Sequence, residues 1–501
     1  MPISPHTPHK GDTMKKAAIT GIVIGALALG VTGGNLVVSQ MLENRIRDSL
    51  GNPPSGMQAQ CDDVCVSFLR RSVTLSNLRL SVPTGEQNCR ELVLRPSFSL
   101  LLAGSFPSLR STLLPESGPV VMGDATVQDM QLRTVQTGDD PAATLKTLNA
   151  SGVFLNADLF AEILQGKRPA PEDLVGKAGV ESIDAVQLRL QPMATDPFVK
   201  GVESIRLRNI VLGTSAKLVE MTQLQVFGIN KSPDASLSLL RLTDIALPPE
   251  LSKRILSGAA RPADFERALM AMDHPFYRTL TLEEGQIILD GQSMGCRRIF
   301  HDWRSTAPMH SISKIEQLNL PAEGRLSVPG LKRLIIDMDG EHLQQGALFL
   351  DKATVNVADI GTLAIEAEHN IDVFQLNPDD SNSALQLLGA QFRKAYLHYK
   401  DKGGIARLLA LFITRKESIS QVDAIAAQIP AALPGEINKP LVDALRTTLL
   451  TPGTLELRLR DGMTMTALDM MDINVIGRMF EVSAVPGKTS VKTQILSVLE
   501  Q

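Results

Sequence analysis

Four cysteines are the residues of this chain with the most obvious capacity for chemistry. Cys61, Cys65 and Cys89 lie close together in the sequence, and Cys296 stands far from them. In an oxidising compartment an even set of this kind forms disulfides. We predict that Cys61 or Cys65 pairs with Cys89 across neighbouring strands. A zinc site is the alternative, but no histidine lies near the trio and the spacing CDDVC is unlike that of common zinc sites.

The densest polar cluster follows Cys296 and is a candidate recognition patch for an anionic head group or a protein partner. It gathers the only tryptophan of the chain with a histidine and three arginines. Its members are Arg297, Arg298, His301, Trp303 and Arg304. The alternative is a solvated loop on which Trp303 packs locally, since runs of charge commonly mark solvent-facing segments.

No recognised catalytic motif supports an enzyme. Gly487-Lys488-Thr489 resembles the end of a phosphate-binding loop, but Val482 stands where that motif needs its first glycine. The eight histidines form no HExxH string, and no GxSxG nucleophile motif occurs. We therefore predict no catalytic residue, no cofactor and no metal, with an unrecognised hydrolase as the remaining alternative.

Length, composition and charge narrow the class of protein. The chain has 501 residues, of which 44% are hydrophobic and 21% are charged. This usage is typical of folded globular domains and excludes a multi-span membrane protein. A formal charge of -4 gives no electrostatic reason to bind nucleic acid.

One segment determines the predicted location. Residues 17–42 carry no charge. As a helix they would extend about 39 Å, at about 1.5 Å per residue, which exceeds the roughly 30 Å hydrocarbon core of a membrane. Lysines precede the segment and balanced charges follow it. The flanks predict a cytoplasmic tail at 1–16, a transmembrane anchor at 17–42 and a body outside the cytoplasm.

The same segment leaves alternatives open. Ala26-Leu27-Ala28 suits a cleavage site, so a removable signal peptide is one alternative and a buried soluble helix is another. Met14 is a second possible start, and it leaves the topology unchanged. Glycines four residues apart allow two transmembrane helices to approach closely, which indicates a possible homodimer. These residues are Gly21, Gly25, Gly30 and Gly34.

After a predicted linker at 43–60, one short pattern recurs along the chain. It reads apolar, any, apolar, any, polar, apolar, any, apolar. Its copies lie at 73–80, 125–132, 205–212, 219–226 and 240–247, with looser copies at 280–289, 348–355 and 390–397. Alternation of apolar and polar residues is typical of a strand with one face on a core.

The polar residue in the middle of each copy breaks the alternation, and an extra residue would turn every later side chain to the opposite face. We predict a β-bulge or a short bend there, because the Asn or Asp found in several copies tolerates unusual backbone angles. The product is a long, curving antiparallel sheet with one continuous apolar face. The candidate residues of this face are Val73, Leu75, Leu78, Leu80, Ile205, Leu207, Ile210 and Leu212. Unrelated strands of an ordinary β-sandwich are the alternative.

Helical periodicity predicts a group of three helices at 403–452. The first helix follows Gly403 and carries Ile405, Leu408, Leu409 and Phe412 on one face. The second starts near Ser420, which together with Asp423, three residues later, forms a plausible N-terminal cap pair. Pro440 suits the first turn of the third. Shorter amphipathic pieces lie at 157–164 and 262–272.

The predicted fold class is α+β and mainly β. A single N-terminal transmembrane helix precedes a β-repeat body at 61–402 with short helical insertions. The helical group at 403–452 and C-terminal strands and a tail at 453–501 complete the chain.

An anchor followed by short strands with Asn or Asp after the second apolar residue resembles the AsmA-like group of bacterial envelope proteins. The resemblance covers about the first two thirds of the exported part and rests on pattern, and the helical group at 403–452 departs from it. It implies an inner-membrane tether, a curved β-groove in the periplasm and a role in moving or organising phospholipids. It further implies that the apolar face at 73–80 lines a lipid-holding groove.

We therefore expect a non-enzymatic cell-envelope protein, anchored in the bacterial inner membrane, that binds lipid or another apolar ligand along a curved sheet in the periplasm. An apolar face left open would favour this function. The alternative is an envelope scaffold or assembly factor that acts through protein contacts. The expected partners are the membrane, phospholipid and other envelope proteins, without nucleic acid.

Overall fold

The computed structural model describes residues 39–500 with gaps. The gaps are 41, 45, 49, 52–57, 83–84, 106–111, 113, 116, 135–140, 165–168, 192–198, 228–232, 257–274, 290, 323–326, 372–387, 414–418, 434 and 470–471. The predicted tail at 1–16, the predicted helix at 262–272 and the anchor at 17–42, except Ser39, Gln40 and Leu42, lie outside the described residues. Within the described part, no helix combines the length and the hydrophobicity that a membrane crossing requires.

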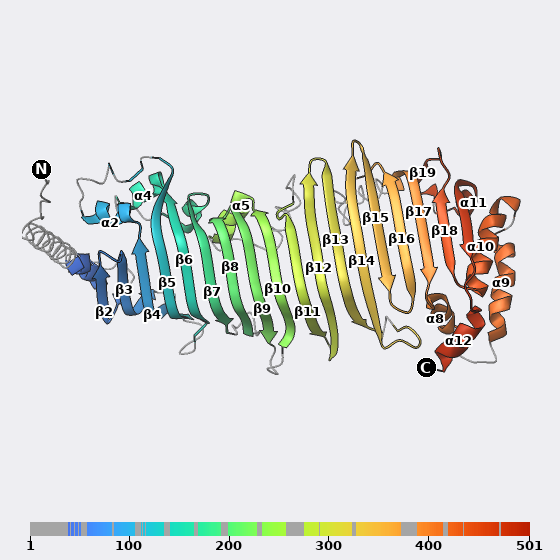
Figure 1. The fold of residues 1–501 in the computed structure, drawn as a ribbon, viewed down its shortest axis with the longest axis horizontal. Coiled ribbons are helices and arrows are strands. Elements are labelled where there is room, and N and C mark those ends of the chain that lie inside the picture. The colour runs from blue at the N-terminus through green and yellow to red at the C-terminus, as the bar shows by residue number, and fades with distance from the viewer. Residues whose placement is uncertain are drawn as a thin grey trace, which may run out of the picture. The chain divides into compact units, whose positions relative to one another are not determined.

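The described chain is mainly β, with a long open antiparallel sheet and a few helices near the C-terminus (Figure 1). This confirms the predicted class in its main outline. The chain divides into two compact units, residues 1–197 with 204–213 and residues 198–203 with 214–501.

In the first unit, strands that follow one another in the sequence pair antiparallel from β2 to β7, and β1 also pairs with β3. The strands are β1 (Gln58–Gln60), β2 (Asp63–Ser67), β3 (Ser72–Val82), β4 (Gly85–Pro96), β5 (Pro119–Thr134), β6 (Ala143–Asn156), β7 (Ala178–Leu190) and most of β8 (Val199–Val211). The helices are α2 (Phe98–Ser105), α4 (Ala157–Leu164) and the short 3-10 helix η2 (Pro171–Leu174).

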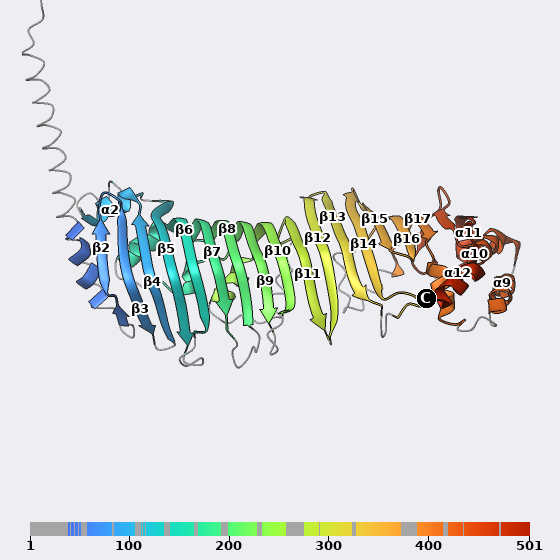
Figure 2. The same ribbon diagram turned by 60° about the horizontal axis from the view of Figure 1, so that its bottom comes forward.

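In the second unit, antiparallel pairing runs without a crossover from β9 to β18, β20 follows β18, and β19 pairs with β17. The strands are β9 (Ser215–Phe227), β10 (Pro233–Ala246), β11 (Thr279–Leu289), β12 (Gln292–Thr306), β13 (Met309–Pro321), β14 (Arg333–Gln345), β15 (Leu348–Val357), β16 (Gly361–His369), β17 (Gln391–Asp401), β18 (Thr454–Leu459), β19 (Met465–Thr466) and β20 (Phe480–Val485). Strands β9 to β14 lie side by side in both views of Figures 1 and 2.

The bends predicted in the five strict copies are present, and a left-handed backbone marks each one. The polar residue of every strict copy has a positive φ near 50°, a region that few residues other than glycine adopt. These residues are Asn77 (51°), Asp129 (49°), Asn209 (47°), Gln223 (52°) and Asp244 (47°). Glu284 (51°) in the loose copy at 280–289 joins them, together with Gln187 (54°) and Gln317 (50°), which the repeat pattern did not predict.

At most of the bends the register continues one for one, so these are not β-bulges, whereas at Gln317 the pairing of β13 with β14 shifts by one residue, as in a β-bulge. Ser76 pairs with Glu91 and Leu78 pairs with Cys89, so Asn77 stands opposite Arg90. Each strand of the pair therefore contributes one residue to the bend, and both strands return their apolar side chains to the original face.

The bend residues line up across the strands of each unit. In the first unit, the left-handed Asn77, Asp129 and Gln187 lie on β3, β5 and β7, with Arg90 and Lys146 opposite them on β4 and β6. The corresponding row of the second unit, which we call the bend row, consists of Gln223, Ser238, Glu284, Arg297 and Gln317 on β9 to β13. Its left-handed members lie on every second strand.

A further left-handed residue lies toward the end of β6, β8 and β10, namely Gly152, Asn209 and Asp244. By contrast, the described ranges 348–355 and 390–397 contain no left-handed residue. For the copy at 348–355 the predicted bend is wrong, because its polar residue Lys352 continues a regular antiparallel ladder. In the copy at 390–397 the pairing of β17 with β16 shifts by one residue between Phe392 and Lys394, an irregularity of the β-bulge kind beside the polar position.

The helical predictions are confirmed in part. Helix α4 has the predicted bounds, and α8 (Gly404–Ala410), α9 (Gln421–Ala432) and α10 (Lys439–Leu450) form the predicted group, which lies beyond β17 in Figure 1. Pro440 is in the first turn of α10, but the Ser420 side chain does not cap α9. Helices α2, α5 (Pro249–Leu256), α11 (Ile473–Met479) and α12 (Val491–Leu499) were not predicted.

The predicted apolar face of the first of these helices is divided in the structure. Leu409 is buried and Ile405 packs beside it against α9 and α12, whereas Leu408 and Phe412 are 62% and 75% exposed. Helix α8 ends at Ala410. Phe412 therefore lies beyond the helix and does not follow its periodicity.

Candidate functional site

One face of the second unit carries a continuous row of apolar side chains. Residues directly opposite each other in neighbouring strands project to the same face. The members of this row, each opposite the next, are Met221, Leu240, Leu282, Ile299, Ile315, Met338, Val355, Leu363, Tyr399, Leu455 and Ala484. We call the side of the sheet that carries this row the apolar face.

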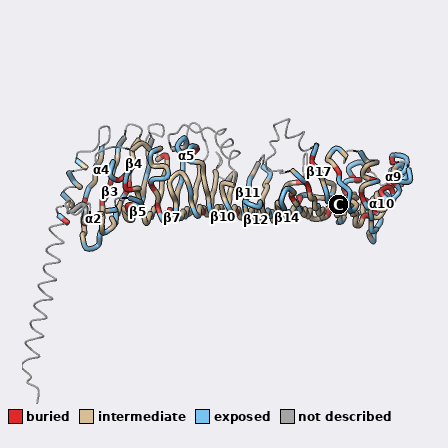
Figure 3. Tube along the Cα trace, turned by 90° about the horizontal axis from the view of Figure 1, so that it is seen from above, coloured by how far each residue is buried: buried red, intermediate tan, exposed pale blue. Residues whose placement is uncertain are grey.

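The apolar face between β9 and β14 is left open by the residues that the structure describes. All described strands belong to one sheet, so no second sheet covers them. Most residues of these strands have intermediate burial, drawn in tan in Figure 3, and Ile287 is 48% exposed. Open apolar surface of this kind marks sites of interaction with partners, lipids or ligands.

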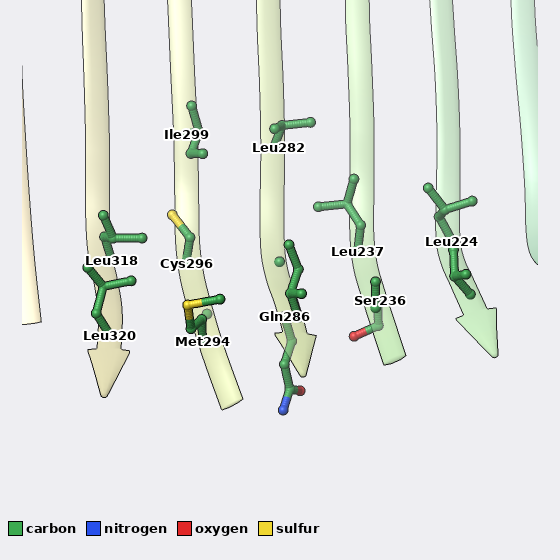
Figure 4. A pocket seen from close by; sticks show the side chains of 15 residues that line it. Leu224, Ser236, Leu237, Leu282, Gln286, Met294, Cys296, Ile299, Leu318 and Leu320 are labelled. Atoms are coloured by element: carbon green, nitrogen blue, oxygen red, sulfur yellow. The ribbon is translucent and has the colours of Figure 1, made fainter. Parts of the chain in front are cut away.

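A hollow of about 430 Å³ lies on this face across β9 to β13 (Figure 4). We call it the apolar hollow. Its lining consists of Leu224, Val226, Ala235, Ser236, Leu237, Leu282, Gly285, Gln286, Ile287, Met294, Gly295, Cys296, Ile299, Leu318 and Leu320. Its volume lies in the range of small-molecule and acyl-chain sites, which are lined mainly by apolar side chains.

Gly285 lines the hollow at a position where the neighbouring strands carry a large side chain. It is the first residue after the left-handed Glu284, the place that Leu224 and Leu318 occupy after Gln223 and Gln317. A Cβ atom at Gly285 would lie 3.6 Å from Cδ1 of Leu237, which is ordinary contact. The glycine therefore leaves out one large side chain from an otherwise apolar row, although its own backbone conformation does not require a glycine.

Polar groups gather at one end of the hollow. In Figure 4 the Gln286 amide and Ser236 lie toward the ends of the strands, whereas Leu282 and Ile299 lie further toward their middle. The Cys296 thiol lies between these two regions, and its Sγ donates to the Glu316 carbonyl oxygen at 3.5 Å. Burial, followed by the nearby Glu284 and Glu316, raises the pKa of this thiol.

The candidate recognition patch does not form one surface. All five of its residues lie on β12, so the alternative of a solvated loop is wrong as well. His301 stands opposite Leu280 on the apolar face, while Arg298 stands opposite Glu283 on the other face. Alternation along a strand separates them, and the ring of Trp303 packs 5.0 Å from that of His301. Burial lowers the pKa of His301.

The candidate apolar face predicted from the first copy of the repeat is closed. Val73, Leu75 and Leu78 are buried in one cluster, and Leu80 packs against it, so both halves of this copy face the same way. Leu42, Ile46 and Leu50, spaced as on a helix, also pack on the cluster. The copy at 205–212 keeps Ile205, Leu207, Ile210 and Leu212 at intermediate burial on β8 or directly after it.

All four cysteines are free thiols, so the structure does not contain the predicted disulfide. Cys65 pairs with Thr74 and Cys89 pairs with Leu78, which places them on opposite sides of β3. Two strand spacings, roughly 9.6 Å, separate such residues, whereas a disulfide requires Cα atoms within about 7 Å. Cys61 precedes β2 and lies across β3 from Cys89 in the same way.

A buried cluster of two histidines and an aspartate lies on the apolar face and was not predicted. Asp351 Oδ1 contacts His342 Nδ1, and its Oδ2 lies 2.6 Å from His369 Nε2. The Phe349 ring stacks on both imidazoles at 5.3 and 6.1 Å. Burial alone would raise the pKa of Asp351, but the hydrogen bonds from the two histidines lower it to about 2.

The part of the chain that the structure describes holds no group of acidic, histidine or cysteine side chains arranged to hold a metal ion. Gly21, Gly25, Gly30 and Gly34, the basis of the predicted homodimer, lie outside the described residues. Comparisons of the chain with protein-family models, with curated proteins and with solved structures find no match.

Proposed function

We propose that this protein is a non-enzymatic component of the bacterial cell envelope that binds a lipid or another apolar ligand on its open sheet. In this proposal residues 17–42 anchor the chain in the inner membrane and the body lies in the periplasm. The observation that carries the proposal is the apolar hollow at Gly285 on a face that the described residues leave open.

Three physical properties of the hollow support an apolar ligand. Its walls are built mainly from aliphatic side chains, and burying such surface is worth roughly 25 cal/mol per Å². Its few polar groups lie at one end, which suits a ligand with one polar terminus. The strands on both sides hold the walls in a continuous hydrogen-bonded ladder, so the site needs little reorganisation to accept a ligand.

A glycine substitution tests the proposal directly. Gly285→Leu restores the missing side chain to the row and fills the hollow, where its Cβ atom meets Leu237 Cδ1 at 3.6 Å and the Cys296 carbonyl oxygen at 3.9 Å, both ordinary contact distances. The full chain is extracted from membranes, transferred to an amphipathic polymer and analysed by native mass spectrometry. The wild type should retain a lipid-sized adduct, and the variant should retain at least about tenfold less, as expected for loss of about 1.4 kcal/mol of binding.

Gly340→Leu is the matched control. Gly340 lies on the apolar face of β14 outside the hollow, and a Cβ atom there finds nothing nearer than Ser313 at 3.8 Å. This variant should retain the adduct at the wild-type level. Absence of any adduct from the wild type, or an equal loss in both variants, would refute a ligand site at Gly285.

One observation favours a second candidate function, that of an envelope scaffold acting through protein contacts. Leu408, Leu411 and Phe412 form an exposed apolar group at the end of α8. Crosslinking and copurification of the wild type and of a Leu408→Ser, Phe412→Ser variant would test it. A stoichiometric partner that the variant loses, together with an empty hollow, would favour the scaffold over ligand binding.

A further inference from the structure

A second hollow lies behind the first, on the opposite face of the same strands. Its volume is about 770 Å³, and we call it the polar hollow. Its lining consists of Ser236, Ser238, Glu284, Gly285, Gln286, Ser293, Gly295, Cys296, Arg297, Gln317, Asn319, Arg333 and Ile335. Five of these residues, Ser236, Gly285, Gln286, Gly295 and Cys296, also line the apolar hollow. One layer of backbone therefore separates the two hollows.

The bend row supplies much of the polar lining. Ser238, Glu284, Arg297 and Gln317 are four of its five members. In the equivalent row of the first unit, Arg90 stands opposite Asp129 and forms an ion pair with it at 3.2 Å. Arg297 occupies the equivalent place between Glu284 and Gln317, but it forms no ion pair with any described residue. Its guanidinium is available to an external anion.

Arg333 brings a second guanidinium to the polar hollow from β14. Its Nη2 donates to the Ser293 carbonyl oxygen at 2.8 Å, a contact that holds the side chain over the end of β12 without neutralising its charge. Against these two cations the lining contains one carboxylate, that of Glu284. The hollow therefore carries a net positive charge.

The remaining lining indicates a ligand with several oxygen atoms. Asn319 places a buried side-chain oxygen without a hydrogen-bond partner in this wall, and this acceptor suits a hydroxyl group of the ligand rather than its phosphoryl oxygens. The hydroxyls of Ser236 and Ser238 line the same space. Guanidinium groups with hydroxyl and amide side chains are the usual partners of phosphoryl oxygens, which Arg binds through parallel N–H donors.

We propose that the polar hollow binds a phosphoryl group, held by Arg297 and Arg333, and that this group is the head of an amphiphile whose chain fills the apolar hollow. The proposal rests on the proposed function for the chain part of the ligand. The proposal places the head next to Gln286 and Ser236, which line both hollows. A free phosphate would meet the same arginines without using the apolar hollow.

Three probes distinguish an amphiphile with a phosphoryl head from free phosphate. Dodecyl phosphate carries a chain and an anion, glycerol monolaurate carries a chain of the same length without charge, and inorganic phosphate carries the anion alone. Binding of each probe to the full chain in an amphipathic polymer is measured by equilibrium dialysis below the micellar concentration. Charge-assisted hydrogen bonds predict that the wild type binds dodecyl phosphate about 10- to 100-fold more tightly than glycerol monolaurate.

The variant Arg297→Gln, Arg333→Gln should lose this preference and bind both amphiphiles equally. A matched control is Arg304→Gln, Lys332→Gln, which removes the same charge from β12 and from the residue beside Arg333, outside both hollows. The control should keep the preference. Gly285→Leu should weaken both amphiphiles and leave inorganic phosphate unaffected.

The outcomes distinguish the two proposals. If the wild type binds both amphiphiles equally, or if the two double variants behave alike, the phosphoryl site is refuted and the proposed function stands. If glycerol monolaurate does not bind, the proposed function fails. Arginine-dependent binding of inorganic phosphate would in that case support the anion site with free phosphate as its source, and no arginine-dependent binding at all would refute both.

Discussion

Gly285 stands directly opposite Cys296 in the pairing of β11 with β12, and both residues line the apolar hollow. The chain thus carries a native chemical reporter next to the glycine that lines the site. The thiol is of intermediate burial, whereas Cys65 of the first unit is exposed.

This arrangement predicts the reactivity of Cys296. Because burial and the nearby glutamates raise its pKa, little thiolate exists at neutral pH, and maleimide labelling should be slow and accelerate as the pH rises toward and beyond 9. A bound dodecyl chain should slow the labelling of Cys296 at least about fivefold, since the chain fills the space in front of the thiol. Peptide mass spectrometry measures the rate, with Cys65 as the internal control. Equal protection of both cysteines would contradict the prediction.

The left-handed backbone at the bend residues predicts which substitutions the fold tolerates there. Gln223→Val places a β-branched residue at a φ of 52°, which should cost about 1–2 kcal/mol of the free energy of unfolding of the second unit. Gln223→Asn should be tolerated, because Asn adopts this conformation readily. Urea unfolding monitored by fluorescence of Trp303, the only tryptophan, reports the change in this unit.

Gln225→Val is the control for that series. Gln225 lies two residues further along β9, where the strand pairs regularly with Ser236. A β-branched residue suits such a position, so this variant should be neutral. If the valines at 223 and 225 had the same effect, the bends would not depend on the left-handed backbone.

The half-buried Asp351 predicts acid sensitivity of the second unit. Its pKa in the folded chain is about 2, below the ordinary value of 3.8, so its carboxylate stabilises the fold above pH 4 and this contribution is lost as the pH falls from 4 toward 2. Asp351→Asn should cost about 2 kcal/mol of unfolding free energy at pH 7, since it removes the charged acceptor of His342 and His369.

The difference between wild type and variant should shrink below pH 4, because the Asp351 carboxyl group of the unfolded wild-type chain binds a proton there, and it should disappear near pH 2, where the folded carboxyl group does so as well. Urea unfolding at pH 7 and at pH 3.5 measures it. Asp339→Asn, on the exposed part of β14, should change the free energy little at either pH. A difference for Asp351→Asn that is independent of pH would contradict the role assigned to its charge.

The predicted anchor is tested by deletion. Removing residues 1–38 and adding a cleavable signal peptide should release the body into the soluble periplasmic fraction, whereas the full chain should remain in the carbonate-washed membrane pellet. The deletion spares Ser39, whose hydroxyl accepts a hydrogen bond from the Phe68 amide at 3.0 Å. A full chain found in the soluble fraction would contradict the anchor.

Much of the architecture could be predicted, because each bend interrupts the alternation of apolar and polar residues in the sequence. A polar residue that breaks alternation reveals the bend at Asn77 and Asp244. The copies around Gln187 and Gln317 were not predicted, because the alternation of apolar and polar residues before each Gln is irregular. Val186 precedes Gln187 at a position that the pattern leaves open but that is polar in all five strict copies, and Ser313 replaces an apolar residue before Gln317.

The sites could not be predicted, because they depend on which strands meet and in which register. Gly285 is one of many glycines until its position between Leu237 and Cys296 is known. The residues of the buried cluster, His342, Asp351 and His369, are 9 and 18 residues apart, spacings that correspond to no local motif. The disulfide prediction failed for the same reason, since β3 separates its cysteines.

The recurrence of the left-handed backbone on every second strand has a consequence for how such a protein changes length. Its structural unit is the hairpin, because one strand with a left-handed bend residue and one strand without it alternate along the bend row. Loss or duplication of a single strand would bring two left-handed positions into adjacent strands. Relatives of this chain should therefore be longer or shorter by even numbers of strands.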